Sequence, residues 1–201
     1  QPAFFHIIEY MPYAMLTILA FGDSLTAGFG LPPQASFVDQ LQRSLDRLHQ
    51  NTRIINAGVS GDTTAGGLSR IHRALEVKPD VVILELGAND AILGSLPELT
   101  KANLDLLIRT CLNARARVIL AGVKPPMAFT PGYREEFAAL YAELAAHYDL
   151  KLVPDFLEGI LHHPERTLAD GIHPNTHGVA YIVSAVLPVV LETLAEIRRH
   201  C

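Results

Sequence analysis

Short apolar runs alternate with segments of helical periodicity along this chain, and this alternation limits the fold more than any other feature of the sequence. Each run is only a few residues long and nearly all apolar, which is typical of strands buried on both faces of a sheet. The runs therefore predict five strands, at residues 15–21, 53–56, 81–86, 117–122 and 151–153.

The segments between the runs carry apolar residues at the spacing of an amphipathic helix. In one of them Phe37, Leu41 and Leu45 fall on the same helical face. This pattern predicts helices at 37–49, 64–75, 99–113, 133–147 and 176–199. Thr176 is a suitable N-cap for the last helix, and the arginines that end it suit the negative end of the helix dipole.

Strands separated by helices indicate parallel pairing through right-handed crossovers, with helices on both faces of the sheet. We therefore expect a flavodoxin-like α/β fold, a three-layer α/β/α sandwich with a five-stranded parallel sheet. In such folds the ligand site lies outside the carboxyl ends of the strands, near the point where the strand order reverses. The loops to inspect first are those after the first three strands, at 22–36, 57–63 and 87–97.

Length and composition indicate one domain, because a chain of 201 residues with 49% hydrophobic residues can bury a single core. We assign residues 15–201 to that domain and residues 1–14 to an N-terminal extension of uncertain role. The apolar start of the chain lacks the basic region and cleavage site of a signal peptide, and it is too short to span a bilayer. These features favour a cytoplasmic location without stable membrane insertion; a periplasmic or secreted location applies if a leader has been removed.

Charge and cysteine content exclude two further classes of function. The formal net charge is −5 and the basic residues are scattered, so the chain offers no basic surface for nucleic acid. Cys111 and Cys201 have neither the number nor the spacing of a disulfide framework or a CxxC metal site. Neither observation addresses the oligomeric state, which stays open.

A candidate nucleophile follows the first predicted strand. Residues 22–25 read GDSL, so Ser24 projects from a strand end into the expected cleft, and the flanking glycines allow a substrate to approach the backbone. The structural alternative is that Asp23 or Ser24 simply turns or caps the chain at this point.

A serine nucleophile needs an adjacent base, usually a histidine that a carboxylate orients. Residues 170–175 read DGIHPN, and a three-residue separation in this loop can bring the Asp170 carboxylate to one nitrogen of His173 while the other nitrogen faces the serine. His177 is the nearest competitor, but it falls at the start of the last helix. A capping or surface-loop role for Asp170 and His173 is the alternative.

Ester cleavage also needs hydrogen-bond donors for the negative oxygen of the tetrahedral intermediate. Three candidates are the backbone N–H of Ser24, the backbone N–H of Gly58 after the second strand, and the side-chain amide of Asn89 after the third strand. Taken singly, Gly58 also fits a turn glycine and Asn89 a loop-bracing amide.

These blocks resemble the GDSL or SGNH hydrolases, a family whose four blocks supply Ser, Gly, Asn and His in that order. Ser24 in GDSL, Gly58 in NAGVSGDT, Asn89 in GAND and His173 in DGIHPN match them, and Asp170 matches the third member of the triad. The resemblance runs from Met15 to the last helix. It is greatest to the bacterial branch of arylesterases and multifunctional acyl-CoA thioesterase–lysophospholipases. Many relatives have glycine at the position of Ala88.

The resemblance implies a serine esterase that forms an acyl-serine intermediate and needs no metal or cofactor. The implied substrates are small aryl or short-to-medium acyl esters and acyl thioesters, with lysophospholipids or carbohydrate O-acetyl esters as alternatives. Apolar loop residues near the predicted cleft are candidates for acyl contacts: Leu31, Ile92, Leu93, Met127, Phe129 and Ile172.

Two interpretations without catalysis compete with the esterase. A flavodoxin-like module could bind a mononucleotide at the same loops, but the first loop has neither GxGxxG nor GxxxxGK[ST], and Asn89, Asp170 and His173 would be left unexplained. A non-catalytic relative could bind acylated carbohydrate or a protein, but Ser24, Asp170 and His173 are all intact.

Overall fold

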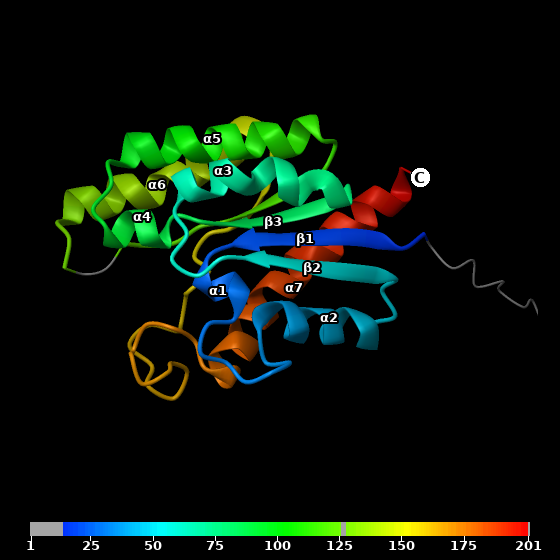
Figure 1. The fold of residues 1–201 in the computed structure, drawn as a ribbon, viewed down its shortest axis with the longest axis horizontal. Coiled ribbons are helices and arrows are strands. Elements are labelled where there is room, and N and C mark those ends of the chain that lie inside the picture. The colour runs from blue at the N-terminus through cyan, green and yellow to red at the C-terminus, as the bar shows by residue number, and fades with distance from the viewer. Residues whose placement is uncertain (1–13, 126–127, 201) are drawn as a thin grey trace, which may run out of the picture.

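A five-stranded, all-parallel sheet lies between two layers of helices in the computed structural model, which describes residues 14–125 and 128–200 (Figure 1). The strands are β1 (Leu16–Gly22), β2 (Thr52–Gly58), β3 (Val81–Glu85), β4 (Arg117–Ala121) and β5 (Lys151–Val153). Their spatial order is β2-β1-β3-β4-β5, so the direction of winding reverses between β1 and β3. The fold is therefore the predicted α/β sandwich, and its switch point lies at β1.

Helices cover the two faces of the sheet in separate groups (Figure 1). One layer holds α2 (Phe37–Arg47) and α7 (Thr176–Arg199), which contact each other. The other holds α3 (Thr64–Ala74), α5 (Pro97–Asn113) and α6 (Pro131–Tyr148), and α5 packs against both of the others. A short 3₁₀ helix, Leu75–Val77, extends α3.

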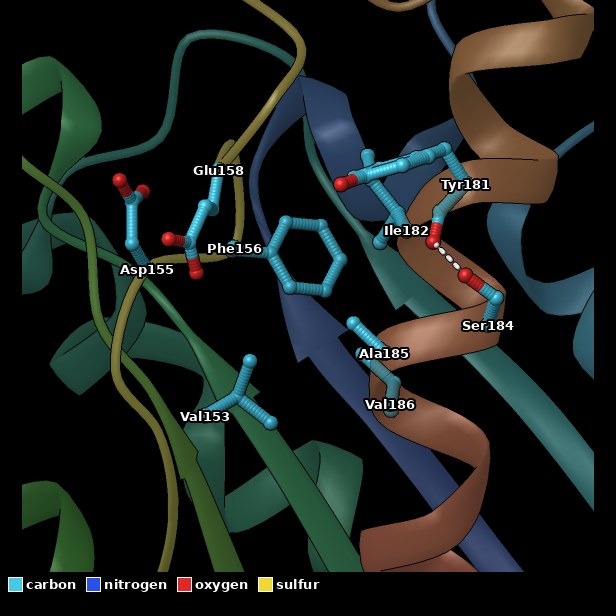
Figure 2. A pocket seen from close by; sticks show the side chains of 9 residues that line it. All are labelled: Val153, Asp155, Phe156, Glu158, Tyr181, Ile182, Ser184, Ala185 and Val186. Atoms are coloured by element: carbon cyan, nitrogen blue, oxygen red, sulfur yellow. Dashed lines mark hydrogen bonds between the residues drawn. The ribbon is translucent and has the colours of Figure 1, made fainter.

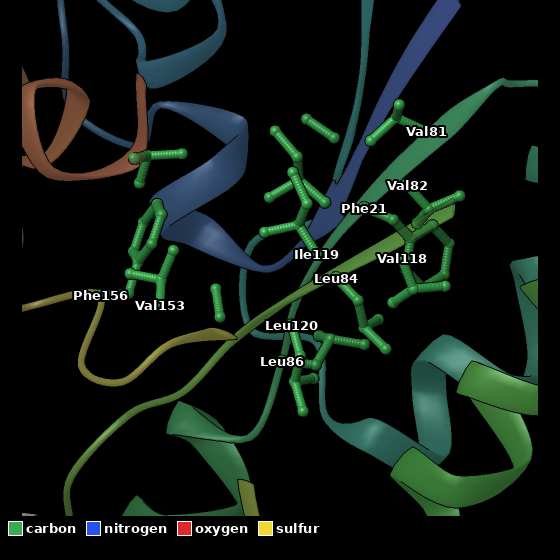
Figure 3. Close-up of a cluster of buried hydrophobic side chains, with 14 of the residues drawn as sticks. Phe21, Val81, Val82, Leu84, Leu86, Val118, Ile119, Leu120, Val153 and Phe156 are labelled. Atoms are coloured by element: carbon green, nitrogen blue, oxygen red, sulfur yellow. The ribbon is translucent and has the colours of Figure 1, made fainter. Parts of the chain in front are cut away.

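The apolar runs form strands because both faces of the central sheet are covered. All seven residues of β1 and all five of β3 are buried, and Figure 3 shows side chains from β3 and β4 filling the space beside Phe21. Each Leu, Ile, Val or Phe side chain that is fully buried stabilises the fold by about 1.5–3 kcal/mol. The core therefore fixes the strand ends that carry the candidate site.

The amphipathic stripe of α2 faces this core as its sequence predicts. Leu41 and Leu45 are fully buried, and the helix begins with a capping box in which Ser36 and Asp39 each accept a backbone N–H of the other. α7 has the length and hydropathy of a membrane-crossing helix, but it packs against α2, β4 and β5 in the core of the described structure.

Apart from shifts of one or two residues at the ends of several elements, two details differ from the sequence predictions. The loops expected after the first and third strands contain short helices, α1 (Ser24–Ala27) and α4 (Ala88–Ile92), which are too short for a helical period to reveal. The N-cap of α7 is Asn175 instead of Thr176, because the Asn175 side chain accepts the N–H groups of His177 and Gly178. The expected extension at 1–14 lies, except for its last residue, outside the described residues, and the single domain at 15–201 stays a prediction.

Candidate active site

The carboxyl ends of β1, β2 and β3 bring the three motif loops together. The Asn89 side-chain amide, in α4, donates to Asp23 Oδ2 at 3.0 Å and to the Asp62 carbonyl at 2.8 Å. Asp23 follows β1 and Asp62 lies in the loop after β2, so one amide joins the ends of three strands. This cluster lies at the switch point, where α/β folds place their ligand sites.

Ser24 is the first residue of α1 and is partly exposed. Asp23 caps this helix, because its Oδ1 accepts the N–H of Leu25 at 2.9 Å. Gly28 ends the helix with φ +85°, a left-handed conformation that favours glycine. Within the described part of the chain, the backbone N–H of Ser24 has no hydrogen-bond partner. The turn thus leaves both the hydroxyl and the N–H of Ser24 available to a substrate.

A hydrogen-bonded chain connects Ser24 to the loop before α7. His173 Nε2 lies 3.0 Å from Ser24 Oγ, and His173 Nδ1 lies 2.7 Å from Asp170 Oδ2. The other Asp170 oxygen accepts the backbone N–H groups of Ile172 and His173 at 2.9 and 3.0 Å. Gly171, with φ +70°, allows the tight turn that brings these groups together. The structure therefore places the three predicted residues in the geometry of a serine hydrolase triad.

Asp170 is held as a carboxylate. Its pKa is lowered to about 2, mainly by the hydrogen bond from the Ile172 N–H and further by hydrogen bonds from His173. An ionised Asp170 accepts a hydrogen bond from the N–H at Nδ1 of His173, which leaves Nε2 as the acceptor for the serine hydroxyl. The arrangement can thus remove the proton from Ser24.

Phe29, which was not among the predicted site residues, packs on the candidate base. Its ring centroid lies 4.6 Å from that of His173 at an interplanar angle of 41°. About half of the Phe29 side chain is exposed, so this ring forms part of the wall of the site. The only sequence signal was an apolar residue between two glycines in the first motif loop.

The structure does not support the prediction that Gly58 donates to an oxyanion. Its N–H already donates to Asn56 Oδ1 at 2.9 Å, and a Cβ on Gly58 would collide with the backbone of Ala27. Gly58 is therefore a close-approach glycine that lets β2 pack against α1. Sequence alone could not separate these roles, because both require glycine.

Gly61, three residues after Gly58, is the better candidate for the backbone N–H that donates to an oxyanion. Its φ is +82°, a Cβ added to it would meet no atom within 4 Å, and its N–H has no partner among the described residues. The neighbouring residue Asp62 is bonded to Asn89, which places Gly61 in the same cluster as Asp23. The sequence signal that could have indicated it was a second glycine in the same loop, between Ser60 and Asp62, residue types that favour turns.

Asn89 acts as a brace in this structure. Both hydrogens of its amide nitrogen are directed at protein acceptors, Asp23 and the Asp62 carbonyl. This is the loop-bracing alternative that the sequence left open. Donation to an oxyanion would require exchange of one of these two hydrogen bonds.

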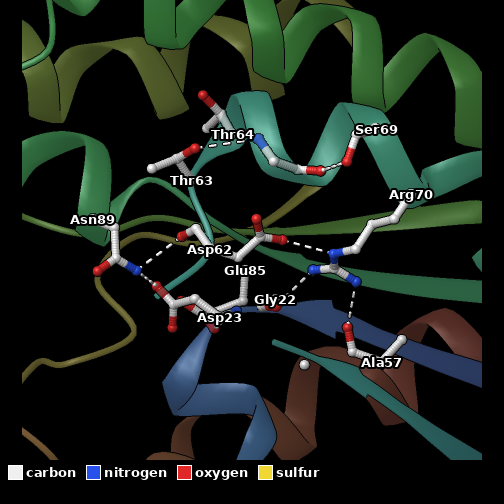
Figure 4. A network of polar contacts seen from close by, with 12 residues as sticks. Gly22, Asp23, Ala57, Asp62, Thr63, Thr64, Ser69, Arg70, Glu85 and Asn89 are labelled. Carbon is white, nitrogen blue, oxygen red and sulfur yellow. Dashed lines mark hydrogen bonds and ion pairs between the residues drawn. The ribbon is translucent and has the colours of Figure 1, made fainter. Parts of the chain in front are cut away.

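Arg70 of α3 connects the backbone segments that surround the site (Figure 4). Its Nε pairs with Asp62 Oδ2 at 2.6 Å, while its two terminal nitrogens donate to the carbonyls of Ala57 and Gly22 at 2.7 and 2.9 Å. The guanidinium also stacks on the Phe21 ring at 3.9 Å. One side chain therefore fixes the ends of β1 and β2 and the loop between β2 and α3.

The predicted acyl contacts fall into different environments. Ile92, Leu93 and Ile172 are exposed, with Leu93 the most exposed at 73%, whereas Leu31 is partly buried against the core. Phe129 is stacked on Tyr133 and lies close to Gly94. Met127 lies outside the described residues. The exposed apolar side chains also include four that were not predicted as acyl contacts: Phe29, Val59, Leu96 and Leu99.

A cavity of about 160 Å³ lies away from this cluster, between the end of β5 and α7 (Figure 2). Val153, Phe156 and Tyr181 are among its lining residues, and it shares no residue with the serine, histidine and aspartate described above. Within residues 14–125 and 128–200, no group of His, Cys, Asp and Glu is arranged to hold a metal ion. The expectation that no metal or cofactor is needed stays a prediction.

Comparisons with known proteins identify relatives of this chain. The profile of the GDSL-like lipase/acylhydrolase family matches residues 20–181. The chain is 34% identical over 178 residues to an arylesterase of Vibrio mimicus, which covers 88% of this chain and 89% of that protein. It is 33% identical over 180 residues to thioesterase 1/protease 1/lysophospholipase L1 of Escherichia coli K12, covering 89% of this chain and 85% of that protein.

A solved structure of an esterase shows the same fold as this chain. The crystal structure of AlinE4, an SGNH-hydrolase family esterase, superposes with a TM-score of 0.75 at 41% sequence identity. The match covers 90% of this chain and 97% of that one. The likeness therefore extends over the sheet, the helices and the motif loops together.

Proposed function

This chain belongs to the GDSL-like lipase/acylhydrolase family, whose members are SGNH esterases, and from this premise we propose that it hydrolyses aryl and short-to-medium acyl esters and acyl thioesters through an acyl group on Ser24. That the protein is a carboxylic ester hydrolase follows from the family. The substrate class and the roles of individual residues are the proposal. The observation that carries it is the chain of contacts from Ser24 through His173 to Asp170.

In the first half of the reaction, Ser24 Oγ attacks the carbonyl carbon and its proton passes to His173 Nε2. Asp170 keeps the imidazole oriented and stabilises the imidazolium that forms. The backbone N–H groups of Ser24 and Gly61 are the free donors for the oxyanion, and Asn89 joins them if it releases one of its present acceptors. Loss of one such donor typically costs about 2.7–4 kcal/mol of transition-state stabilisation.

The tetrahedral intermediate then collapses. The bond from the carbonyl carbon to the leaving oxygen or sulfur breaks, and His173 Nε2 returns the proton to the leaving alcohol or thiol. Water repeats the sequence on the acyl-serine: His173 accepts its proton, the hydroxide adds to the carbonyl, and Ser24 leaves with the proton from His173. The products are a carboxylic acid and the free enzyme.

The apolar rim of the site favours acyl and aryl groups. The exposed apolar side chains at the carboxyl edge of the sheet include Phe29, Leu93 and Ile172 on loops and Ile92 at the end of α4. Such a rim gains free energy by covering an alkyl chain or an aromatic leaving group. The names of the arylesterase and thioesterase relatives support the same substrate classes.

Lysophospholipids are the second candidate substrate. Lysophospholipase L1 is part of the name of the E. coli relative, and an acyl chain bound along Leu93 and Leu96 would suit a lipid ester. A carbohydrate O-acetyl ester would gain little from this apolar rim. A binding module without chemistry would not need a histidine within hydrogen-bond reach of Ser24.

The test is hydrolysis of p-nitrophenyl esters from acetate to palmitate, and of matched acyl-CoA thioesters, by the wild type and by Ser24→Ala. The wild type is expected to cleave the shorter esters and some thioesters, and Ser24→Ala to lose roughly a thousandfold or more of the rate. Ser184→Ala, which removes an exposed hydroxyl on α7, is the matched control and keeps the rate. An inactive wild type, or an active Ser24→Ala variant, would contradict the proposal.

A further inference from the structure

Two carboxyl groups, those of Asp23 and Glu85, are buried together close to Ser24. Asp23 follows β1 and Glu85 ends β3, and both residues are completely inaccessible to solvent. The pairing of Gly22 with Glu85 in the β1–β3 ladder sets the two side chains next to each other. A Cβ on Gly22 would lie 2.5 Å from Glu85 Oε2, so the glycine makes room for the Glu85 carboxyl.

The contacts of the two carboxyl groups differ. Both oxygens of Asp23 accept N–H groups, Oδ1 from Leu25 at 2.9 Å and Oδ2 from Asn89 at 3.0 Å, as an ionised carboxylate does. Glu85 Oε2 accepts the Thr26 hydroxyl at 2.8 Å and makes a long contact of 3.4 Å with the N–H of Asp23. Glu85 Oε1 is buried and has no partner in the described part of the protein. An unpartnered oxygen is far less costly on a neutral acid than on a carboxylate.

No cation compensates a second charge at this place among the residues that the structure describes. Arg70, the cation drawn in the network of Figure 4, is engaged by Asp62 and by two backbone carbonyls. The other titratable groups that act on Asp23 are His173 and Asp62, and the buried Tyr141 lies within electrostatic range of both Asp23 and Glu85. Asp62 is itself a carboxylate, so the surroundings favour one negative charge in the pair over two.

The electrostatics agree with this assignment. Burial raises the pKa of Asp23 to about 6, while the hydrogen bond from Leu25 and the charge of His173 oppose the rise. Burial, and then the neighbouring Asp23, raise the pKa of Glu85 well above its usual range. At neutral pH the last proton of the pair therefore stays on Glu85.

We propose that Glu85 is a positioning residue of the hydrolytic site: it remains a neutral carboxylic acid beneath an ionised Asp23, and the pair holds the Asn89 amide and the start of α1 in place beside Ser24. Glu85 touches neither substrate nor His173 and acts through Asp23. This inference rests on the proposed roles of Ser24 and Asn89.

The physical effect is one of orientation. The Asp23 carboxylate binds the first turn of α1 and Asn89 at once, so a shift of this carboxylate moves the nucleophile relative to its oxyanion donors. A neutral Glu85 can donate a hydrogen bond to Asp23, which stabilises its charge. An ionised Glu85 would repel Asp23 and disturb the same contacts.

The first test detects the proton directly in the free protein. Infrared spectra at neutral pH are expected to show the carbonyl stretch of a protonated carboxylic acid in the wild type, and Glu85→Gln is expected to lose it. Asp80→Asn, which removes a carboxylate bonded to the other end of β1, keeps the band and serves as the control. Because no substrate is present, the result does not depend on whether Ser24 is the nucleophile. A band that survives in Glu85→Gln would overturn the proposal.

The second test separates positioning from packing. Glu85→Gln retains a neutral group that can donate to Asp23 and accept from Thr26, so its kcat is expected to fall by at most about threefold. Glu85→Leu lacks these polar atoms, and its kcat is expected to fall about ten- to a hundredfold while KM stays within about twofold. Asp80→Asn lowers stability without this change in kcat. Equal kcat in Glu85→Leu and the wild type, or an equally large loss in Glu85→Gln, would overturn the proposal.

Discussion

His173 Nε2 lies 3.0 Å from Ser24 Oγ although 149 residues separate the two in the sequence. Ser24 stands at the end of the first strand, and His173 stands in the loop that enters the last helix. The first strand lies at the switch point of the sheet. α7 packs on the face of the sheet that α2 also covers, and the loop before α7 brings the histidine to the same edge as Ser24. The topology therefore brings the two groups within hydrogen-bonding distance.

Removal of the Asp170 charge should impair catalysis with little effect on substrate binding. Asp170→Asn presents an amide to Nδ1 of His173 and favours the wrong tautomer, so kcat is expected to fall by roughly 10²–10⁴. Steady-state kinetics on a p-nitrophenyl ester measure this. Asp155→Asn, which removes a carboxylate paired with Lys124, is the matched control. An Asp170→Asn variant with the kcat of the wild type would contradict the triad.

The two glycines of the second motif loop should respond differently to alanine. Gly58→Ala drives a methyl group into the backbone of Ala27, and we expect a loss of more than about 2 kcal/mol in the free energy of unfolding. Gly61→Ala meets open space and incurs only the cost of a left-handed backbone, about 1–2 kcal/mol. Urea unfolding of both variants measures the difference. A larger loss for Gly61→Ala would contradict the assigned packing of Gly58.

The fold could be predicted closely because its signals are local and redundant. β5 and α7 have the predicted bounds, and the other strands end within two residues of their predicted ends. Short apolar runs and helical stripes recur along the whole chain, so one misjudged boundary does not change the topology. The short helices α1 and α4 could not be predicted, since they depend on tertiary contacts such as the one between Asn89 and Asp23.

The site was only partly predictable. Ser24, Asp170 and His173 are recognisable because few other combinations of residues suit nucleophile and base. Gly58 was predicted as an oxyanion donor because a glycine that donates an N–H and one that admits a neighbouring backbone look alike in a sequence. Glu85 gave no signal, because a glutamate at the end of an apolar run also fits an exposed strand end.

Phe29 should support the base through its ring. Phe29→Leu removes the aromatic contact with His173, and we expect kcat to fall by about three- to tenfold, a modest effect for one exposed aromatic contact. Phe29→Tyr keeps the ring and is expected to retain most of the rate. Kinetics of the two variants on one ester provide the comparison. Equal rates for leucine and tyrosine would show that the contact does not matter.

The buried charge of Asp23 should make stability depend on pH. Because its pKa is raised to about 6, the folded state binds a proton more tightly than the unfolded state does. Its contribution to stability is therefore full at low pH and is lost as pH rises through about 6. Between about pH 4 and pH 7, the change in the free energy of unfolding with rising pH should be more negative in the wild type than in Asp23→Asn. Urea titrations across this range measure both slopes, and identical slopes would contradict a buried, titrating Asp23.

The most direct test of the hydrolytic site is covalent labelling with a fluorophosphonate, followed by peptide mass spectrometry. The phosphonyl group mimics the tetrahedral intermediate and is captured by an activated serine. We expect a single label on the peptide that contains Ser24, and much slower labelling after His173→Ala. A label on a different residue, or a Ser24 that does not react in an active protein, would contradict the central claim.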